Sequence, residues 1–177
     1  MKKRALFLDR DGIINKAYVV NGKSYPPRKI DNFYLLPGVS KSLKLSKELG
    51  FLNIIITNQP DISSGKTTQE FVDTCHRKLL DALPIDDIYV CSHSDEELCS
   101  CRKPKPGMIL DAQKKWNIDL EKSFLVGDRW KDIEAGQSVK CCCFFVNYKY
   151  NERQPKQPFV EVSDLEEAVK NIYEREK

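Results

Sequence analysis

A short apolar run that ends abruptly in two carboxylates constrains the fold of this 177-residue chain more than any other stretch. Residues 5–8 contain no polar side chain, which is typical of a strand buried on both faces of a sheet. Asp9, Asp11 and Gly12 follow almost at once. In an open α/β sheet the ligand crevice lies beyond the carboxyl ends of the strands, so we expect both acids at its mouth.

The rest of the chain repeats a strand-then-helix rhythm about five times. Further strands are predicted at residues 51–56, 85–90, 123–126 and 141–146, and helices at 39–49, 67–80, 106–116, 132–138 and about 163–176. Residues 15–32 are polar and rich in turn signals, so they are predicted to be a loop over the crevice. With right-handed crossovers this order gives an α/β fold with a doubly wound, mainly parallel sheet flanked by helices.

Length and composition favour a single domain over residues 1–177, with no room for a second. The net charge is only +3 and the basic residues are scattered, so we expect no nucleic-acid partner. No apolar run approaches the roughly 18 residues of a membrane span, so we expect no membrane partner and a cytoplasmic location. A monomer is expected. The 7 cysteines are an odd number and do not suggest a disulfide scaffold.

Polar side chains also stand at the ends of later predicted strands. Thr57 and Asn58 follow the second strand, and Asp128 follows the fourth, with Asp132 close behind. Any one such pair is more often an ordinary turn, but the carboxyl ends of parallel strands meet at one edge. Carboxylates gathered there repel one another unless a hard cation such as Mg²⁺ lies between them. With Lys103 beside them, the site could hold an anion and support phosphoryl transfer.

A second group of side chains has the spacing of a metal site. Cys91 and His93 are separated by one residue, as are Cys99 and Cys101 five residues further on. These soft ligands can close a tetrahedral site around Zn²⁺ in a loop over residues 91–104, and four protein ligands predict a structural role. Isolated surface thiols are the simpler alternative. A zinc site is favoured because this polar segment has little apolar content to order it.

Four stretches of this chain occur in the order found in one known family. They are Leu8-Asp9-Arg10-Asp11-Gly12, Ile56-Thr57-Asn58-Gln59, Arg102-Lys103-Pro104, and Val126-Gly127-Asp128 with Asp132. Together they resemble the motifs of the haloacid dehalogenase-like (HAD) phosphatases over about residues 4–146. The resemblance implies a Mg²⁺-dependent phosphomonoester hydrolase that works through an aspartyl-phosphate, on a core without a cap domain.

The resemblance also implies roles for individual residues. Asp9 is expected to be the nucleophile, and Asp11 the general acid that protonates the leaving alcohol and later activates water. Mg²⁺ is expected on the Asp9 carboxylate, the Asp11 main-chain carbonyl and Asp128, with Asp132 behind these ligands. The residues expected to bind the phosphoryl group or the remainder of the substrate are Arg10, Asn15, Tyr18, Thr57, Asn58, Gln59, Pro60, Arg102, Lys103 and Arg129.

The zinc-type loop and the Lys-Pro-Lys-Pro-Gly-Met sequence at residues 103–108 narrow the resemblance. They are similar to a capless branch that contains heptose bisphosphate phosphatases and histidinol-phosphate phosphatases. The residue 103–108 sequence is more like the heptose enzymes, which implies a small phosphorylated sugar as substrate. The five-residue spacer suits either, so histidinol phosphate stays open as an alternative. Outside enzymes, the alternative is a non-catalytic interaction module stabilised by zinc.

Other residues are predicted to have ordinary structural roles. His76 is interpreted as a surface or hydrogen-bonded histidine on a helix. Cys75 and residues 141–143 are interpreted as packing residues. Residues 149–156 are interpreted as a solvated connection to the last helix. None of these is expected to take part in chemistry.

Overall fold

The computed structural model describes residues 2–177 and is built around one six-stranded sheet. In spatial order its strands are β5 (Asp87–Cys91), β4 (Phe51–Asn58), β1 (Arg4–Leu8), β6 (Phe124–Gly127), β7 (Cys142–Val146) and β8 (Val160–Val162). Every neighbouring pair is parallel. The predicted doubly wound α/β fold is confirmed, and β1, which carries Asp9 at its end, lies in the interior of the sheet.

Five α-helices flank the sheet, and two short 3₁₀ turns, η1 (Ile30–Asn32) and η2 (Leu120–Lys122), lie in its connections. The helices are α1 (Val39–Glu48), α2 (Gln69–Ala82), α3 (Gly107–Trp116), α4 (Trp130–Ser138) and α5 (Leu165–Glu176). Thr68 accepts a hydrogen bond from the Phe71 amide and so begins α2. Gly50, with a φ of +84°, follows α1 in the left-handed conformation that commonly ends a helix.

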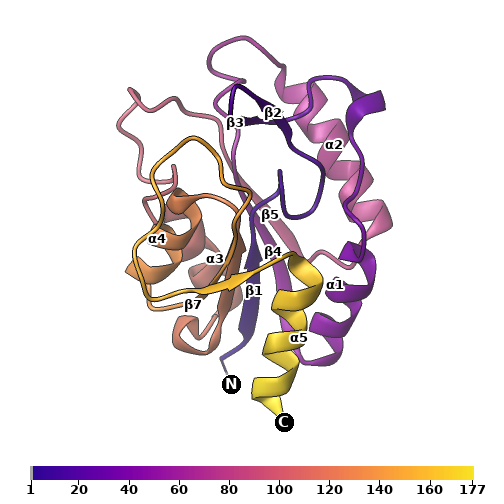
Figure 1. The fold of residues 1–177 in the computed structure, drawn as a ribbon, viewed down its shortest axis with the longest axis vertical. Coiled ribbons are helices and arrows are strands. Elements are labelled where there is room, and N and C mark those ends of the chain that lie inside the picture. The colour runs from indigo at the N-terminus through magenta and orange to yellow at the C-terminus, as the bar shows by residue number, and fades with distance from the viewer. Residues whose placement is uncertain (1) are drawn as a thin grey trace.

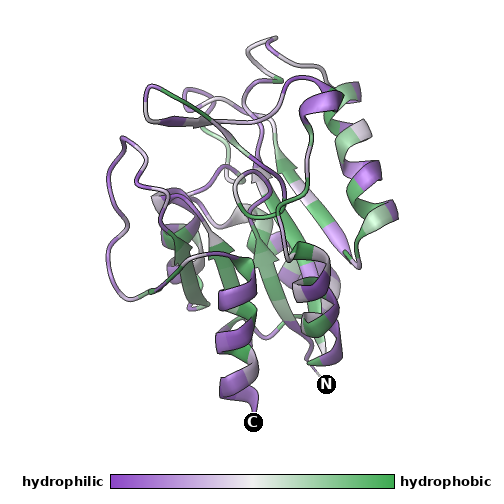
Figure 2. Ribbon diagram, turned by 45° about the vertical axis from the view of Figure 1, so that its right-hand side comes forward, coloured by the Kyte–Doolittle hydropathy of each residue, from purple (hydrophilic) through white to green (hydrophobic). Residues whose placement is uncertain are grey.

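Side chains that alternate along β1 belong to two hydrophobic cores, one on each face of the sheet. Leu6 and Leu8 belong to a core with apolar residues of α1 and α5, whereas Ala5 and Phe7 belong to a core with residues of α3 and α4. Figure 1 shows the same division: α1 and α5 lie on one side of the sheet, and α3 and α4 lie on the other. The central strands are largely hydrophobic, whereas the helices are hydrophilic along much of their outer surface (Figure 2). Such buried strands explain the unbroken apolar runs in the sequence.

Two elements differ from the sequence prediction. Residues 18–25, predicted as loop, form an antiparallel hairpin of β2 (Tyr18–Val20) and β3 (Lys23–Tyr25) around Asn21 and Gly22. Between the predicted connection at residues 149–156 and the last helix lies β8, which the sequence did not predict. Each of these strands has only three residues, and β2 and β3 are largely exposed, so no run of apolar residues marks any of them.

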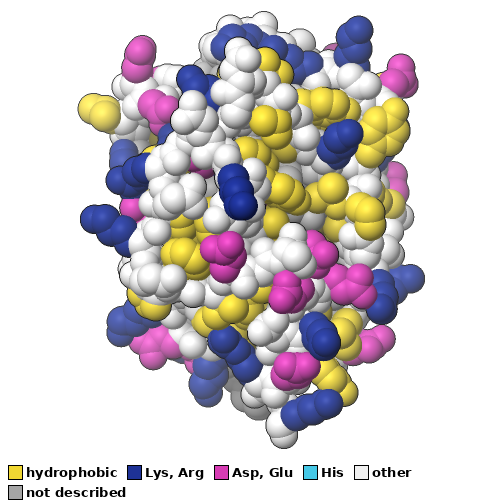
Figure 3. Space-filling view, viewed as in Figure 1, with side chains coloured by type: hydrophobic (Ala, Val, Ile, Leu, Met, Phe, Trp, Pro, Cys, Tyr) yellow, Lys and Arg dark blue, Asp and Glu magenta, His cyan; other side chains and the backbone are white. Residues whose placement is uncertain are grey.

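The surface over the carboxyl edge of the sheet is formed by the hairpin and the loops around it, at the end of the molecule away from both termini (Figure 1). On the face seen in Figure 3, basic and acidic side chains are interspersed, and hydrophobic side chains gather in the upper half. Within residues 2–177, no helix has the length and apolar character needed to cross a membrane. Ser24 of the hairpin lines the same cavity as Asp9, so the hairpin covers the strand ends.

Candidate active site

Three buried carboxylates converge at the carboxyl ends of β1 and β6. Asp9 follows β1 directly, Asp128 follows β6, and Asp132 lies in the first turn of α4. One oxygen from each of them lies within 4.8 Å of the others, and the three residues are at most 8% exposed. The convergence follows from the parallel pairing of β1 with β6, which aligns Leu8 with Val126.

Lys103 reaches this acidic cluster from the loop after β5. Its Nζ lies 2.9 Å from Asp9 Oδ1 and 2.6 Å from Asp132 Oδ1, and it donates to the main-chain oxygen of Ile56 at 2.7 Å. Asn58 holds the main chain of Lys103 from both sides, because its Oδ1 accepts from the Lys103 amide and its Nδ2 donates to the Lys103 carbonyl, each at 3.1 Å. The lysine is thus fixed by the end of β4.

The charges in this cluster do not balance. Burial, followed by the charge of Asp132, raises the pKa of Asp9 to about 6, although Lys103 opposes the shift. Burial and the charges of Asp9 and Asp132 also raise the pKa of Asp128 well above its ordinary value. Burial favours the neutral amine, but Asp132 and Asp9 raise the pKa of Lys103 above its ordinary value, so it stays charged. One lysine faces three acids, and a divalent cation would supply the missing charge.

The Asp128 carboxylate fits a magnesium ligand. Its Oδ2 accepts a hydrogen bond from the Tyr150 hydroxyl at 2.8 Å, whereas its buried Oδ1 has no partner among the described residues. Asp132 is already engaged by Lys103 and by the Arg129 amide. The atoms left to bind a metal ion are carboxylate oxygens, which are the ligands that Mg²⁺ prefers. Asp9 and Asp128 could therefore hold Mg²⁺, with Asp132 behind them.

The close approach of Gly12 to Asp128 adds a constraint. A Cβ at position 12 would lie 2.1 Å from Asp128 Oδ2, and the φ of Gly12 is +94°. Any other side chain would push the carboxylate away. Glycine is required here for conformation and for space.

Asp11 is held by three side-chain donors rather than left to solvent. The guanidinium of Arg10 contacts both of its oxygens, the closest at 2.9 Å, while Asn15 donates to Oδ1 and Gln59 to Oδ2, each at 2.8 Å. Arg10 is 1% exposed, and its Nη1 lies 3.1 Å from His76 Nε2. Arg10, Asn15 and Gln59 were expected to contact substrate. The structure instead turns their polar groups toward Asp11.

The remaining residues predicted to bind substrate fall into two groups. Thr57 is buried at the end of β4, where its hydroxyl accepts from Gln59 at 2.8 Å. Tyr18 donates its hydroxyl to the carbonyl of Asn32 and does not line the cavity described next, which differs from the expectation. The residues that do line that cavity are Asn58, Pro60, Arg102, Lys103 and Arg129.

A cavity opens above the acidic cluster in two parts. The narrow inner part, about 60 Å³, is lined by Asp9, Asp11 and Lys103, and the outer part measures about 390 Å³. Both parts are lined by Ser24, Pro26, Asn58, Arg129 and Lys131. A phosphoryl group could enter the inner part while the rest of a substrate occupies the outer part.

Basic side chains dominate one wall of the outer part. Asp95 Oδ1 accepts from Arg102 at 2.7 Å and from Lys131 at 3.1 Å, so two cations share one carboxylate. Hydrogen bonding to Arg102 is the main cause that holds the pKa of Asp95 well below its usual range. Arg129, on the same wall, bonds Glu152 through its Nε at 3.1 Å. The Arg102 and Lys131 pair leaves a positive charge for an anionic group.

The cysteine and histidine cluster forms in the loop predicted to contain it. The ligand atoms of Cys91, His93, Cys99 and Cys101 lie within 4.8 Å of one another. The sulfurs of Cys91 and Cys99 are 3.8 Å apart, and the Cys101 sulfur lies 3.3 Å from His93 Nδ1. Ligands about 2.3 Å from a tetrahedral zinc ion are about 3.8 Å apart, so the cluster fits Zn²⁺. It also leads directly into Arg102.

Four residues stand out among those of this site that sequence reasoning missed. Lys131 and Ser24 line both parts of the cavity, and Tyr150 and Glu152 bond Asp128 and Arg129. They lie in the hairpin, in α4 and in the segment interpreted as a solvated connection. The one available signal was the tyrosine pair at positions 148 and 150 in an otherwise polar segment, since buried tyrosines usually find a hydrogen-bond partner.

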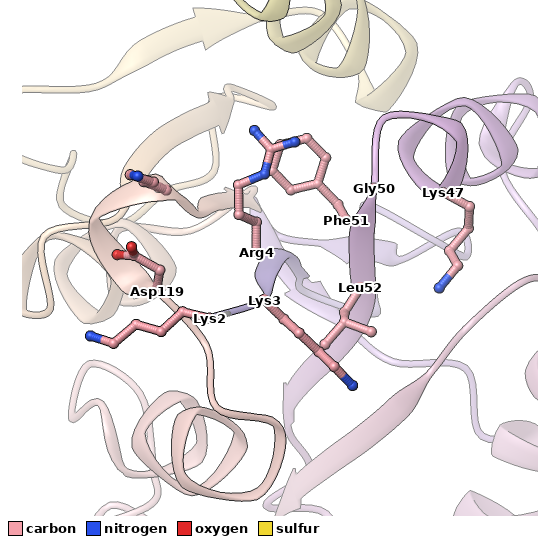
Figure 4. A pocket seen from close by; sticks show the side chains of 9 residues that line it. Lys2, Lys3, Arg4, Lys47, Gly50, Phe51, Leu52 and Asp119 are labelled. Atoms are coloured by element: carbon pink, nitrogen blue, oxygen red, sulfur yellow. The ribbon is translucent and has the colours of Figure 1, made fainter.

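A larger hollow of about 960 Å³ lies at the opposite, amino-terminal edge of the sheet (Figure 4). Its basic residues are partly neutralised, because Arg4 pairs with Glu176 and Lys47 pairs with Asp86 at 2.7 Å. Among residues 2–177, neither cluster of metal-ligating side chains borders it. The chemistry-bearing residues therefore gather at the carboxyl edge alone within the described chain.

Comparison with known proteins agrees with this arrangement. Residues 100–168 match the model of the HAD-hydrolase-like family. A D-glycero-beta-D-manno-heptose-1,7-bisphosphate 7-phosphatase of Helicobacter pylori is 42% identical over 77% of this chain and 79% of that protein. The protein of the same name from Escherichia coli K12 is 37% identical over 74% of this chain and 72% of its own length.

Solved structures agree in fold. A D,D-heptose 1,7-bisphosphate phosphatase from B. bronchiseptica, determined with magnesium and phosphate, superposes with a TM-score of 0.84. It is 23% identical and covers 97% of this chain and 99% of its own. The corresponding protein from Burkholderia thailandensis gives a TM-score of 0.68 at 19% identity, with 97% and 99% covered.

Proposed function

Since the chain belongs to the HAD-like phosphatase family that includes the D-glycero-beta-D-manno-heptose-1,7-bisphosphate 7-phosphatases, we propose that it removes the 7-phosphate from such a heptose bisphosphate. The observation that carries the proposal is the position of Lys103, which lies 2.9 Å from Asp9 inside a narrow cavity at the carboxyl edge. A buried carboxylate beside a fixed ammonium group is what transfer of a phosphoryl group to an aspartate requires.

The proposed reaction has two steps at phosphorus. Asp9 attacks the phosphorus atom, the bond to the sugar oxygen breaks, and Asp11 gives its proton to that oxygen. Asp11 then takes a proton from a water molecule, which attacks the phosphorus of the aspartyl-phosphate and releases inorganic phosphate and Asp9. The hydrogen bonds from Arg10, Asn15 and Gln59 fix the orientation of the Asp11 side chain.

Charge on the transferred group is proposed to be balanced by Lys103 and by main-chain and side-chain donors at the strand ends. Asp132 keeps Lys103 charged and in place at 2.6 Å. Thr57 is proposed to bind a phosphoryl oxygen once its hydroxyl turns from Gln59. Mg²⁺ on the Asp9 carboxylate, Asp128 and the Asp11 carbonyl would neutralise further charge on the phosphoryl oxygens.

The zinc site is proposed to be structural. Four protein ligands leave no open position for a substrate or a water molecule. Cys101 is followed directly by Arg102 and Lys103, so a bound zinc ion would fix the start of the segment that carries both basic residues. The main-chain contacts of Asn58 with Lys103 would then complete its placement.

The outer cavity supports a bisphosphate over histidinol phosphate. Arg102 and Lys131 share the single carboxylate of Asp95, which leaves a net positive charge about the far wall. A second phosphate would be attracted there, whereas the ammonium group of histidinol would be repelled. We therefore assign the far end of the substrate to Arg102, Lys131 and Arg129, with Asn58 and Pro60 on the adjoining wall.

An assay of phosphate release from both substrates tests this assignment. We expect the β-heptose bisphosphate to be hydrolysed with the higher kcat/KM, and only one of its two phosphates to be released. A higher kcat/KM for histidinol phosphate would overturn the choice of substrate. Absence of hydrolysis with every phosphomonoester, in protein that binds Mg²⁺, would favour the non-catalytic interaction module.

The unit that acts is proposed to be a single domain and a monomer. The cavity and both metal-ligand clusters are made from residues of one chain, so no partner is needed to complete the site. The cytoplasm is the expected location, because the three zinc thiols must stay reduced to bind metal.

A further inference from the structure

One hydrogen bond to the acidic cluster comes from a segment that the proposed chemistry does not use. Tyr150, in the loop after β7, donates its hydroxyl to Asp128 Oδ2 at 2.8 Å. The residue is 8% exposed, so water does not readily replace this bond. Among residues 2–177 it is the one side-chain hydroxyl that bonds an acid of the cluster. The proposed reaction thus gives no role to a buried tyrosine that bonds a candidate metal ligand.

The loop is anchored directly after Tyr150. The Asn151 amide donates to the carbonyl of Gly22 in the β2–β3 turn at 2.7 Å. Glu152 bonds Arg129, and the guanidinium of Arg153 lies 3.5 Å from the centre of the Trp130 ring. Because these contacts fix the backbone of residues 151–153, the hydroxyl of Tyr150 is held toward Asp128.

The two oxygens of Asp128 consequently differ in their hydrogen bonding. Oδ2 has the tyrosine hydroxyl, while the buried Oδ1 has no partner among the described residues. A carboxylate rotates about its last bond unless something prevents it, and a buried oxygen without a partner is costly. The hydrogen bond from Tyr150 prevents that rotation and leaves Oδ1 available to a cation.

We propose that Tyr150 is a positioning residue for Mg²⁺: its hydroxyl fixes the Asp128 carboxylate so that Oδ1 is presented to the metal ion. This inference rests on the proposed function, because it assumes that Asp128 is a magnesium ligand. Partners that orient metal ligands contribute to affinity, and their loss typically costs about 10-fold to 100-fold. Tyr150 lines the outer part of the cavity, but its hydroxyl bonds Asp128 and neither Asp9 nor Asp11, so we expect its main effect on affinity for Mg²⁺.

Tyr150→Phe tests the proposal, because it removes one oxygen and keeps the ring that packs at 5.6 Å against Tyr148. The full chain with its zinc retained is dialysed against magnesium-free buffer, and Mg²⁺ binding is measured by calorimetry. We expect the dissociation constant for Mg²⁺ to rise at least about 10-fold. The concentration of Mg²⁺ that gives half-maximal phosphate release should rise by a similar factor, while kcat at saturating Mg²⁺ changes little.

Tyr148→Phe is the matched control from the same loop. Its hydroxyl donates to the Gly12 carbonyl at 3.0 Å and does not contact Asp128. A loss of Mg²⁺ affinity in Tyr150→Phe that exceeds the loss in Tyr148→Phe supports the proposal. Equal losses, or unchanged affinity in Tyr150→Phe, would overturn it. If the unaltered chain binds no Mg²⁺ and releases no phosphate, the proposed function itself fails.

Discussion

The two metal-ligand clusters of this chain are built in opposite ways. Asp9, Asp128 and Asp132 stand at the ends of buried strands or in the first turn of a helix, and the sheet fixes them before any metal binds. The four zinc ligands lie in or beside an irregular loop, and three of them are partly exposed. The acids raise one another's pKa values, whereas the ligands of a structural zinc site are held together by the metal ion.

The difference separates two uses of a metal. A cluster that the fold imposes can hold charges that repel, and these charges can then act on a substrate. A cluster in a loop of little apolar content depends on its metal for order. We therefore expect substitutions in the acidic cluster to abolish phosphate release and leave the fold intact. Substitutions in the zinc cluster should instead loosen the loop and lower the rate of phosphate release indirectly.

The largest expected effect follows removal of the nucleophile. Asp9→Asn should reduce phosphate release by at least about 10⁴-fold, because a carboxamide does not form the acyl phosphate. The melting temperature should stay within a few degrees of the parent, since the change removes a repelling charge from the cluster. Phosphate release and thermal unfolding measured on one preparation check both parts. Activity close to that of the parent would contradict the role of Asp9.

A smaller loss is expected from the zinc cluster. Cys99→Ser should lower the zinc content from about one per chain and reduce kcat/KM by about 100-fold, the usual cost of a displaced catalytic group. Elemental analysis and kinetics measure the two effects. Cys142→Ser, on β7 and outside the cluster, is the control that should keep its zinc. If Cys99→Ser abolished the fold, the sheet would depend on zinc and the comparison would fail.

Substitution of Lys131 tests how the outer part of the cavity binds the far end of the substrate. Lys131→Met should raise KM for the heptose bisphosphate about 10-fold, which corresponds to about 1.4 kcal/mol. The same change should leave KM for a sugar monophosphate nearly unaltered, because no second phosphate is present to lose the contact. Lys140→Met, at an exposed lysine paired with Glu121, provides the control. An equal effect on both substrates would contradict a role in binding the second phosphate.

The last prediction concerns stability in acid rather than phosphate release. Burial, followed by the charge of Arg10, lowers the pKa of His76 to about 4 from 6.5. Below pH 6.5 the unfolded chain takes up a proton that the folded chain refuses, so stability present above pH 6.5 is lost as the pH falls toward 4. Between pH 7 and pH 5 the loss should be about 2 kcal/mol.

His76→Gln isolates this contribution, because glutamine keeps an acceptor for Arg10 and does not titrate. Urea unfolding of the parent and the variant at both pH values gives the two losses. The parent should lose more stability than the variant on going to pH 5. Equal losses would show that His76 takes up its proton in the folded protein as readily as in the unfolded chain.

The sequence predicted what buried strands determine. The apolar run before Asp9, and those before Thr57 and Asp128, marked the strands of a parallel sheet, and parallel pairing then brought their ends together. The spacing of Cys91, His93 and their partners likewise predicted a cluster that the structure contains. These features depend on local patterns, which is why one sequence is enough to find them.

Features that depend on contacts between distant loops were missed or misread. Arg10 was expected at the substrate, but its guanidinium lies on Asp11 and His76, 66 residues away in the chain. Tyr150 lies in a polar segment without periodicity, and only its contact with Asp128 reveals its position. Exposed three-residue strands, such as β2 and β3, likewise carry no pattern that differs from that of a loop.

Trapping of the covalent intermediate tests the central claim most directly. Asp11→Asn should still accept the phosphoryl group from a good leaving group but should hydrolyse it slowly, because no base activates water. After acid quenching, reduction of the acyl phosphate with borohydride converts the labelled aspartate to homoserine, which peptide mass spectrometry locates. We predict homoserine at position 9. Modification at another residue, or substrate turnover with no modified aspartate at any time, would contradict the assignment of Asp9 as the nucleophile.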